Sequence, residues 1–205
     1  MKENYLTKAK ATTIKNEMAG LFKRPQLEFP CHSFALLVLD MQEFFANPDS
    51  HAYIPSFNAI VPEISTLIQA FEKNNLPVIF TKHINTEENA GLMGTWWRDI
   101  IKEDSIINDF NTSGHVVIEK SQYDAFYNTE LENILNSLNI KNLVITGVMT
   151  HLCCETTARS AFVRGFNSFF VIDGTATYNE RFHRNTVYNL SHGFSVPIMA
   201  EELLS

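Results

Sequence analysis

Strand-like and helix-like patterns alternate along almost the whole chain, and this alternation constrains the fold more than any other feature. Short apolar runs of strand length lie at residues 34–39, 77–81, 115–119, 142–146, 169–172 and 196–199. Between several of them, apolar residues recur with the helical period near 60–71, 129–138, 152–164 and 180–190. Because right-handed crossovers place helices on both sides of parallel strands, this pattern predicts a doubly wound, Rossmann-like α/β fold. Its sheet is expected to be mostly parallel and six-stranded, with helices on both faces.

The chain shows no repeat and no linker rich in glycine, proline or serine, so we expect one domain over residues 31–205. A polar N-terminal arm, residues 1–30, precedes it and has room for a short helix. The stretch between residues 83 and 114 has no clear period and is long enough to be a functional loop. We expect that loop to cover a site.

Charge and hydropathy exclude several classes of partner. The formal net charge is −7, and the Lys and Arg residues are scattered, so neither nucleic acid nor an anionic membrane surface is an expected partner. No apolar run reaches the roughly 20 residues that span a bilayer, and the first 23 residues lack the apolar stretch of a signal peptide. These features predict a cytoplasmic protein. The 3 cysteines, 2 of them adjacent, make a poor disulfide framework and are expected to be reduced thiols.

Chemically capable side chains follow three of the predicted strands. Asp40 comes directly after the first strand, Lys120 after the third, and Cys153 opens the helix that follows the fourth. In open parallel sheets, ligands bind beyond the carboxyl ends of the strands. We therefore expect a carboxylate, an ammonium and a thiol to meet at one edge of the sheet.

These three groups suit nucleophilic catalysis. A helix N-terminus, with Thr150 as a plausible N-cap, is expected to lower the pKa of the Cys153 thiol. Asp40 can accept the thiol proton and later deliver it to a leaving group, while Lys120 holds the carboxylate in place. Backbone N–H groups in the turn 147–153 are placed to bind an oxyanion. The reaction expected from this set is addition to a carbonyl followed by hydrolysis.

Three segments resemble isochorismatase-like hydrolases: 37–45 (LVLDMQEFF), 120–131 (KSQYDAFYNTEL) and 147–159 (GVMTHLCCETTAR). The likeness runs from about Ala35 to Leu204 and keeps the order and intervals of the motifs. It implies that Asp40 is the general acid/base, Lys120 its partner and Cys153 the nucleophile, with no cofactor. It also implies a cis peptide bond at Val148–Met149, an oxyanion hole formed by the N–H groups of Met149 and Cys153, and a homo-oligomer, either a dimer or a tetramer.

The sequence departs from some members of that family. Nicotinamidases carry a metal-binding Asp-x-His after the second strand, where this chain reads Thr81-Lys82-His83-Ile84. Because the aspartate is missing, no metal site is expected there. Asp49 and His51 have ligand spacing, but a polar turn is the better interpretation. Cys154 falls where the family has a small apolar residue and is expected to be buried packing.

Aromatic residues near the predicted triad are candidates for the substrate pocket. Trp96 and Trp97 with Arg98 suit a wall that recognises a carboxylate, although a tryptophan packed under a loop is an equal alternative. Phe45, Tyr123 and Phe126 flank the triad residues and are further pocket candidates, with simple core packing as their alternative.

Three functions remain open. The leading hypothesis is a cysteine hydrolase that cleaves a C–N bond, amide or ureido, of a small-molecule substrate through a covalent intermediate. The alternative is isochorismatase-type vinyl ether hydrolysis with Asp40 as the acid, a branch that the stretches 151–154 and 200–204 resemble. A second alternative is a non-catalytic binding module, because a fold alone does not determine function. The presence of all three triad residues argues against the last.

Overall fold

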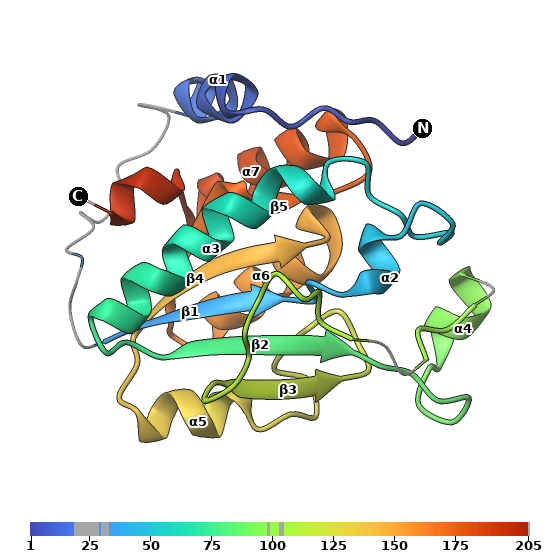
Figure 1. Ribbon diagram of the computed structural model, residues 1–205. Coiled ribbons are helices and arrows are strands. Elements are labelled where there is room, and N and C mark those ends of the chain that lie inside the picture. Colours follow the sequence, from blue (N-terminus) through green and yellow to red (C-terminus); the bar gives the residue numbers. More distant parts are fainter. Residues whose placement is uncertain (19–28, 30–32, 98, 103–104, 205) are drawn as a thin grey trace.

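The computed structural model describes all of the chain except residues 19–28, 30–32, 98, 103–104 and 205. Within the described part, every pair of neighbouring strands in the sheet is parallel (Figure 1). The 6-stranded sheet has the order β3-β2-β1-β4-β5-β6, which confirms the predicted fold class. The strands are β1 (Phe34–Leu39), β2 (Val78–His83), β3 (Val116–Lys120), β4 (Asn142–Val148), β5 (Asn167–Ala176) and β6 (Val196–Ile198).

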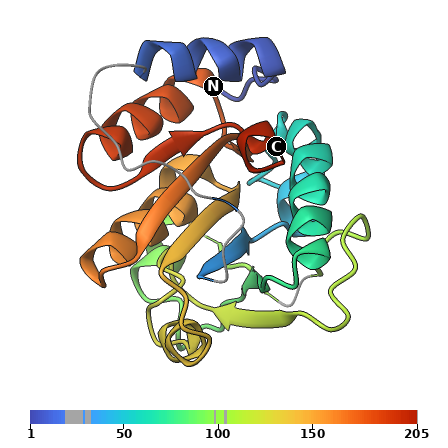
Figure 2. The same ribbon diagram turned by 90° about the vertical axis from the view of Figure 1, so that its left-hand side faces the viewer.

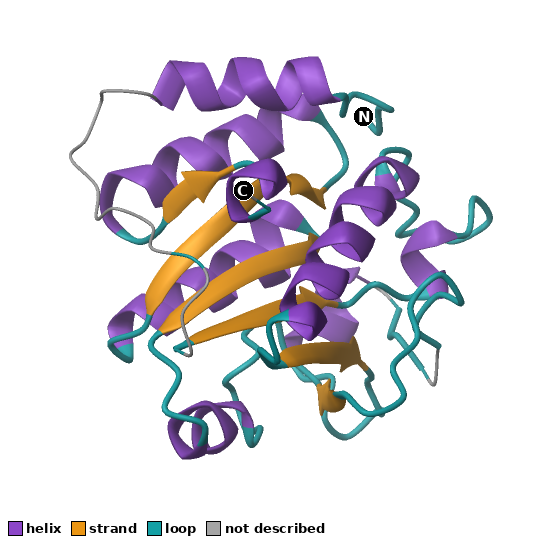
Figure 3. Cartoon of the chain, turned by 60° about the vertical axis from the view of Figure 1, so that its left-hand side comes forward, coloured by secondary structure: helices purple, strands orange, loops and turns teal. Residues whose placement is uncertain are grey.

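Helices cover both faces of the sheet. Helix α3 (Phe57–Lys73) packs against the central strands on one face, and α6 (Glu155–Val163) and α7 (Glu180–Gly193) pack on the other (Figure 2). Figure 3 shows the same layering, with strands between helices. The remaining helical elements are α1 (Lys8–Met18), α2 (Glu43–Ala46), α4 (Leu92–Trp97), α5 (Leu131–Ser137), the π-helical turn η1 (Thr150–Cys154) and the 3-10 turn η2 (Ala200–Leu203).

Burial explains why the central elements form where they do. Strand β1 is buried at every position, as expected for an apolar run that is covered on both faces of a parallel sheet. In α3, Ile60, Ile64, Leu67 and Phe71 recur at spacings of three and four and are fully buried against the sheet. The central strands and their covering helix therefore form one core.

The structure changes two predicted boundaries near the site. The second strand does not end at Thr81 but continues to His83. The predicted helix 152–164 begins instead as the turn η1, whose N-cap position is Met149, and α6 starts at Glu155. The expectation that Thr150 caps this helix is therefore wrong.

Gly147 allows an unusually close approach between β4 and β1. Its φ angle is 108°, and a Cβ atom at this position would lie 2.0 Å from the carbonyl oxygen of Leu39. Leu39 and Gly147 are partners in the parallel register of the two strands. Because β1 and β4 are the adjacent strands at which the chain order reverses direction, ligands are expected beyond their carboxyl ends. That end of the sheet faces α2 and α4 in Figure 1.

The described part of the N-terminal arm packs onto the rest of the protein. Tyr5, Leu6, Ala11, Ile14 and Met18 are buried and belong to the same hydrophobic cluster as the strands of the sheet. The arm is thus part of the core that the residues after 33 build. No helix among the described residues combines the length and the apolar character that crossing a bilayer requires.

Candidate active site

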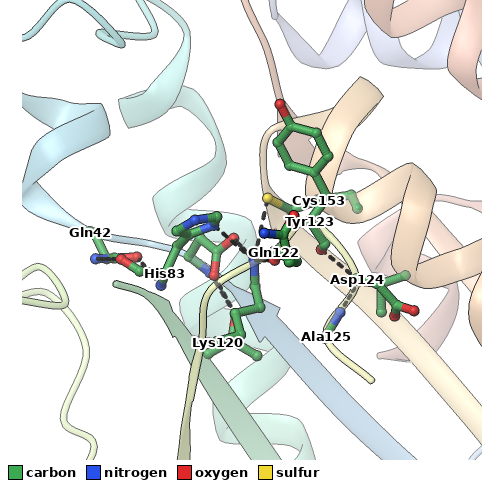
Figure 4. Close-up of polar contacts among 12 residues, drawn as sticks. Gln42, His83, Lys120, Gln122, Tyr123, Asp124, Ala125 and Cys153 are labelled. Atoms are coloured by element: carbon green, nitrogen blue, oxygen red, sulfur yellow. Dashed lines mark hydrogen bonds and ion pairs between the residues drawn. The ribbon is translucent and has the colours of Figure 1, made fainter. Parts of the chain in front are cut away.

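The structure brings Asp40, Lys120 and Cys153 together at the carboxyl end of the sheet. Asp40 follows β1, Lys120 is the last residue of β3, and Cys153 lies in the turn η1 after β4. The Nζ atom of Lys120 lies 2.7 Å from Oδ2 of Asp40. It also lies 3.4 Å from Sγ of Cys153 (Figure 4). All three side chains are buried, so their charges interact with little screening by solvent.

Lys120 is surrounded by acceptors. Besides Asp40 and Cys153, its Nζ atom donates to the carbonyl oxygen of Gln122 at 3.0 Å and lies 3.4 Å from Nδ1 of His83. Burial alone would lower the pKa of Lys120, but the contacts with Asp40 and Cys153 raise it by a larger amount. The net shift of the Lys120 pKa is therefore upward. Lys120 is therefore a permanent cation in this site.

Asp40 is held as a carboxylate. Its Oδ1 atom accepts a hydrogen bond of 2.6 Å from the hydroxyl of Thr81. Burial acts to raise the pKa of Asp40, but the charge of Lys120 more than offsets it, and the pKa lies below its ordinary value. A buried carboxylate that stays ionised beside a thiol is suited to act as a base.

The thiol of Cys153 is protonated at rest. Burial raises its pKa to about 12, although Lys120 acts in the opposite direction. The expectation of a lowered thiol pKa at a helix start is therefore wrong, because desolvation of the thiolate exceeds the electrostatic help from its surroundings. A carboxylate oxygen of Asp40 lies within 4.8 Å of the Cys153 sulfur, so a base is close to the thiol proton.

The Val148–Met149 peptide bond, in the backbone that precedes Cys153, is cis. Met149 and Cys153 both line the cavity beside the triad. An oxyanion hole formed by their N–H groups stays a prediction.

The cavity beside the triad encloses about 520 Å³ of empty space, part of it open to solvent. Among the predicted pocket residues, Phe45, Trp97 and Tyr123 line it, and Nε1 of Trp97 donates a hydrogen bond of 2.7 Å to the hydroxyl of Tyr123. The full lining consists of Phe44, Phe45, His51, Ala52, His83, Asn85, Met93, Trp97, Asp99, Ile100, Ile101, Tyr123, Met149, Leu152, Cys153 and Tyr178. Most of these side chains are apolar or aromatic.

Two predicted pocket residues lie away from this lining. The side chain of Trp96 is 78% exposed, because successive residues of α4 point in directions about 100 degrees apart and Trp97 takes the inward one. Phe126 is buried, with its ring stacked on Phe166 at a centroid distance of 5.9 Å. Phe126 is thus core packing, and Arg98 lies outside the described residues.

His83 belongs to the site although sequence reasoning gave it no role there. Gln42 holds its backbone on both sides: Nε2 of Gln42 donates to the carbonyl of His83 at 3.2 Å, and the N–H of His83 donates to Oε1 of Gln42 at 2.7 Å. Its ring atom Nε2 lies 2.9 Å from Oδ1 of Asn85. Burial, followed by the charge of Lys120, lowers the pKa of His83 to about 4. The ring is therefore neutral, with Nε2–H donating to Asn85 and Nδ1 facing Lys120.

Strand register is the signal that would have identified His83. In the parallel pairing of β2 and β3, His83 lies directly beside Lys120. The predicted strand stopped two residues earlier, so this pairing was not visible from the sequence.

The donor atoms of Asp40, His83 and Cys153 lie within 4.8 Å of one another, a grouping that is able to bind a metal ion. The ammonium of Lys120 contacts each of the three. Lys120 thus fills the position that a metal ion would need, and this donor set does not fit a metal while Lys120 is present. His51, whose spacing from Asp49 resembled a ligand pair, instead pairs with Asp99 at 3.1 Å.

Replacing His83 by alanine is expected to destabilise the fold by about 1–3 kcal/mol, because the side-chain oxygen Oδ1 of the buried Asn85 loses its donor. The free energy of unfolding in urea at pH 7.5 measures this. Since the pKa of His83 is lowered to about 4 in the fold and is about 6.5 when unfolded, neutral His83 stabilises the protein above that range. The difference between the two proteins is therefore expected to shrink as the pH falls from about 6.5 toward 4.

His115→Ala is the matched control for this prediction. The His115 ring pairs with the half-exposed Glu72 at 2.9 Å, and its removal is expected to cost less than about 1 kcal/mol. A His83 variant no less stable than the His115 variant would show that the Gln42–His83–Asn85 contacts do not stabilise the site.

Comparison with known proteins finds relatives that are similar over most of the chain. The family model of the isochorismatase domain matches residues 34–202. Nicotinamidase 3 of Arabidopsis thaliana is 36% identical over 178 residues, which cover 82% of this chain and 86% of the relative. Enterobactin synthase component B of Escherichia coli K12 is 30% identical over 177 residues, which cover 83% of this chain and 62% of the relative.

A solved structure agrees in fold. A cysteine hydrolase from Pseudomonas syringae pv. phaseolicola superposes with a TM-score of 0.82 at 23% identity, covering 89% of this chain and 97% of that chain. The family model spans most of the chain, and nicotinamidase 3 is similar over nearly its whole length. The chain therefore belongs to the isochorismatase family and is a hydrolase.

Proposed function

We propose that this hydrolase cleaves a C–N bond, amide or ureido, of a small molecule through a covalent intermediate on Cys153. The observation that carries the proposal is the contact of a neutral thiol with the buried Asp40–Lys120 ion pair, at the edge of an apolar cavity. Such a set supplies a nucleophile, a base for its proton, and a cation that keeps the base ionised.

The proposed reaction starts when Sγ of Cys153 attacks the carbonyl carbon and Asp40 takes the thiol proton. The N–H groups of Met149 and Cys153 bind the resulting oxyanion. Asp40 then donates that proton to the leaving nitrogen, the C–N bond breaks, and an acyl thioester remains on Cys153. In the second half, Asp40 takes a proton from water as the water oxygen attacks the thioester. The tetrahedral intermediate collapses, the acid leaves, and Asp40 returns the proton to the sulfur.

The charge state of Asp40 favours this reaction over vinyl ether hydrolysis. That alternative needs a protonated Asp40 in the resting enzyme, whereas Lys120 holds the pKa of Asp40 below its ordinary value. The similarity to nicotinamidase 3, named for action on an amide, points the same way. A non-catalytic binding role would leave the buried thiol, carboxylate and ammonium without a purpose.

The cavity lining restricts the substrate class. Phe45, Trp97, Tyr123 and Tyr178 give it flat aromatic walls, and Asn85 is a polar group among them. A small, planar, neutral carboxamide or ureido compound fits such walls better than a highly charged substrate.

The direct test is a panel of small carboxamides and ureido compounds, with ammonia release as the assay and acid-quenched intact mass as the probe of the intermediate. We expect turnover of at least one compound, and a mass increase equal to its acyl group on the peptide that contains Cys153. Turnover of isochorismate with no adduct on Cys153 would contradict the proposal.

The pH dependence of alkylation is expected to separate thiol chemistry from catalysis. Because the pKa of the Cys153 thiol is raised to about 12, its alkylation by iodoacetamide should rise roughly tenfold per pH unit from 7 to 11, without a plateau near the ordinary value of about 8.5. Peptide mass spectrometry measures these rates. Substrate turnover should lack this slope, since Asp40 removes the thiol proton inside the site. A plateau of alkylation near pH 8.5 would show that the thiol is not desolvated at rest.

A further inference from the structure

The first residues of the N-terminal arm lie against the walls of the catalytic cavity. These residues, 1–6, are called the arm segment below. They lie outside the matched family domain, residues 34–202, and Tyr5 and Leu6 within them are buried. In Figure 1 the segment runs above α7 and α3 toward the end of the sheet where the site lies.

The arm segment binds one cavity wall directly after β5. The hydroxyl of Tyr5 accepts a hydrogen bond of 3.2 Å from the N–H of Thr177, and the N–H of Glu3 donates one of 2.7 Å to the carbonyl of Tyr178. The ammonium of Lys2 lies 4.7 Å from the centroid of the Tyr178 ring, a cation–π contact. Tyr178 itself lines the cavity. The arm segment therefore holds this aromatic residue at two points, the backbone carbonyl of Tyr178 and the Tyr178 ring.

The same segment binds a second wall, the loop between α2 and α3. The N–H groups of Tyr5 and Leu6 donate to the hydroxyl of Ser56 at 2.9 and 3.2 Å. Lys2 donates through Nζ to the carbonyl of His51 at 2.6 Å. His51 and its neighbour Ala52 line the cavity. The arm segment thus joins two cavity walls that are more than 120 residues apart in the sequence.

A further link leads from the arm segment toward the nucleophile. Thr177, whose N–H is bound by Tyr5, has its hydroxyl 2.6 Å from Nδ1 of His151. His151 belongs to the turn η1, which carries Cys153. The Tyr5 hydroxyl is itself fixed by Nδ1 of His183 at 2.7 Å. The Tyr5 hydroxyl therefore holds Thr177, which precedes Tyr178 in the chain and contacts the turn that carries Cys153.

We propose that the arm segment is a positioning element of the substrate site, and that Tyr178, which it holds in place, is a specificity-determining residue that limits the size of the acyl group reaching Cys153. The proposal rests on the proposed function in taking Cys153 as the reacting atom. It gives Tyr5 and Lys2 an effect on substrate access although neither side chain lines the cavity.

Size-selective alkylation of Cys153 tests the proposal without relying on hydrolysis. Wild type, Tyr5→Phe, Lys2→Met and Tyr178→Ala are treated with iodoacetamide and with the bulkier N-benzyliodoacetamide, and peptide mass spectrometry gives the rate at Cys153. The ratio of the bulky to the small reagent is expected to rise about tenfold in Tyr178→Ala and about threefold in Tyr5→Phe and Lys2→Met, in line with the loss of one wall or one polar contact. If Tyr5→Phe fails to fold, the surface change Lys2→Met still decides.

Lys8→Met is the matched control, because it removes the exposed ion pair with Glu201 from the arm and leaves the cavity contacts intact. Its reagent ratio should equal that of wild type. In hydrolysis assays, Tyr5→Phe and Lys2→Met are expected to raise KM about threefold to tenfold with kcat changed less than twofold.

Two results would overturn the proposal: reagent ratios in Tyr5→Phe and Lys2→Met equal to that of the control, or the absence of any alkylation at Cys153 in all of the proteins. Failure of the proposed function has a different signature. Undiminished amide hydrolysis by Cys153→Ala would refute the covalent mechanism and would leave a shifted reagent ratio unaffected.

Discussion

Cys153→Ala is expected to lower kcat for amide hydrolysis by about 10⁴-fold or more, with a smaller effect on KM. The substitution removes the atom that attacks the carbonyl, and Asp40 acting on water alone is a far weaker route. The variant keeps the Asp40–Lys120 ion pair, so its fold and its pocket should be retained. Steady-state ammonia release and thermal denaturation, measured on the same preparation, separate loss of chemistry from loss of structure.

Cys154→Ala is the control for this experiment. Cys154 is fully buried next to the nucleophile, and its Sγ atom faces the carbonyl of Thr146 at 4.0 Å instead of the cavity. Its replacement should cost some stability and change kcat less than about threefold. If Cys153→Ala keeps most of its activity, the covalent mechanism is wrong and direct water activation by Asp40 takes its place.

Lys120→Met is expected to destabilise the protein by about 3–5 kcal/mol at pH 7.5 and to abolish turnover. The substitution leaves the fully buried Asp40 without its counterion, which is the costly way to break a buried pair. Burial then raises the pKa of Asp40, so the carboxyl is protonated and cannot accept the thiol proton. Urea denaturation and ammonia release measure the two effects.

The pH dependence of stability should change sign at this position. In wild type the pKa of Asp40 is lowered, so the pair stabilises the fold at neutral pH and that contribution is lost as the pH falls through the lowered pKa. In Lys120→Met the pKa is raised, so the cost is largest at high pH and shrinks on acidification. The double variant Asp40→Asn, Lys120→Met should recover most of the lost stability and none of the activity. A single variant as stable as wild type would show that the pair is not desolvated.

The sequence predicted that Asp40, Lys120 and Cys153 would lie close together because Asp40 and Lys120 directly follow predicted strands. Parallel strands bring such ends to one edge of the sheet. Cys153 was found because the turn after the fourth strand carries a family motif. Each of these signals lies along the chain and needs no knowledge of packing.

His83 was missed because the sequence does not reveal where β2 ends. Lys82 and His83 are polar and look like the start of a loop, although they continue β2 and His83 is buried. The raised thiol pKa was missed for a related reason, since desolvation depends on how completely the surroundings close over Cys153. Burial of polar groups is a property of the assembled fold and leaves no periodic trace in the sequence.

The tryptophan pair shows a third limit. Sequence placed Trp96 and Trp97 together as one wall, but the direction of each side chain depends on the phase of the short helix α4. A helix of 6 residues contains too few turns for its apolar face to be read from the sequence. The cavity contact of Trp97 and the exposure of Trp96 required the structure.

The close approach at Gly147 couples the position of Asp40, after β1, to that of Cys153, after β4. Asp40 follows Leu39, which Gly147 contacts, and Cys153 lies in the turn that Gly147 precedes, so the spacing of Asp40 and Cys153 depends on the backbone contact at this position. Pocket residues such as Met93 and Trp97 lie on a separate segment. Substitutions at Met93 and Trp97 are therefore expected to reshape the pocket, whereas any side chain at position 147 would force β1 and β4 apart and change the distance between Asp40 and Cys153.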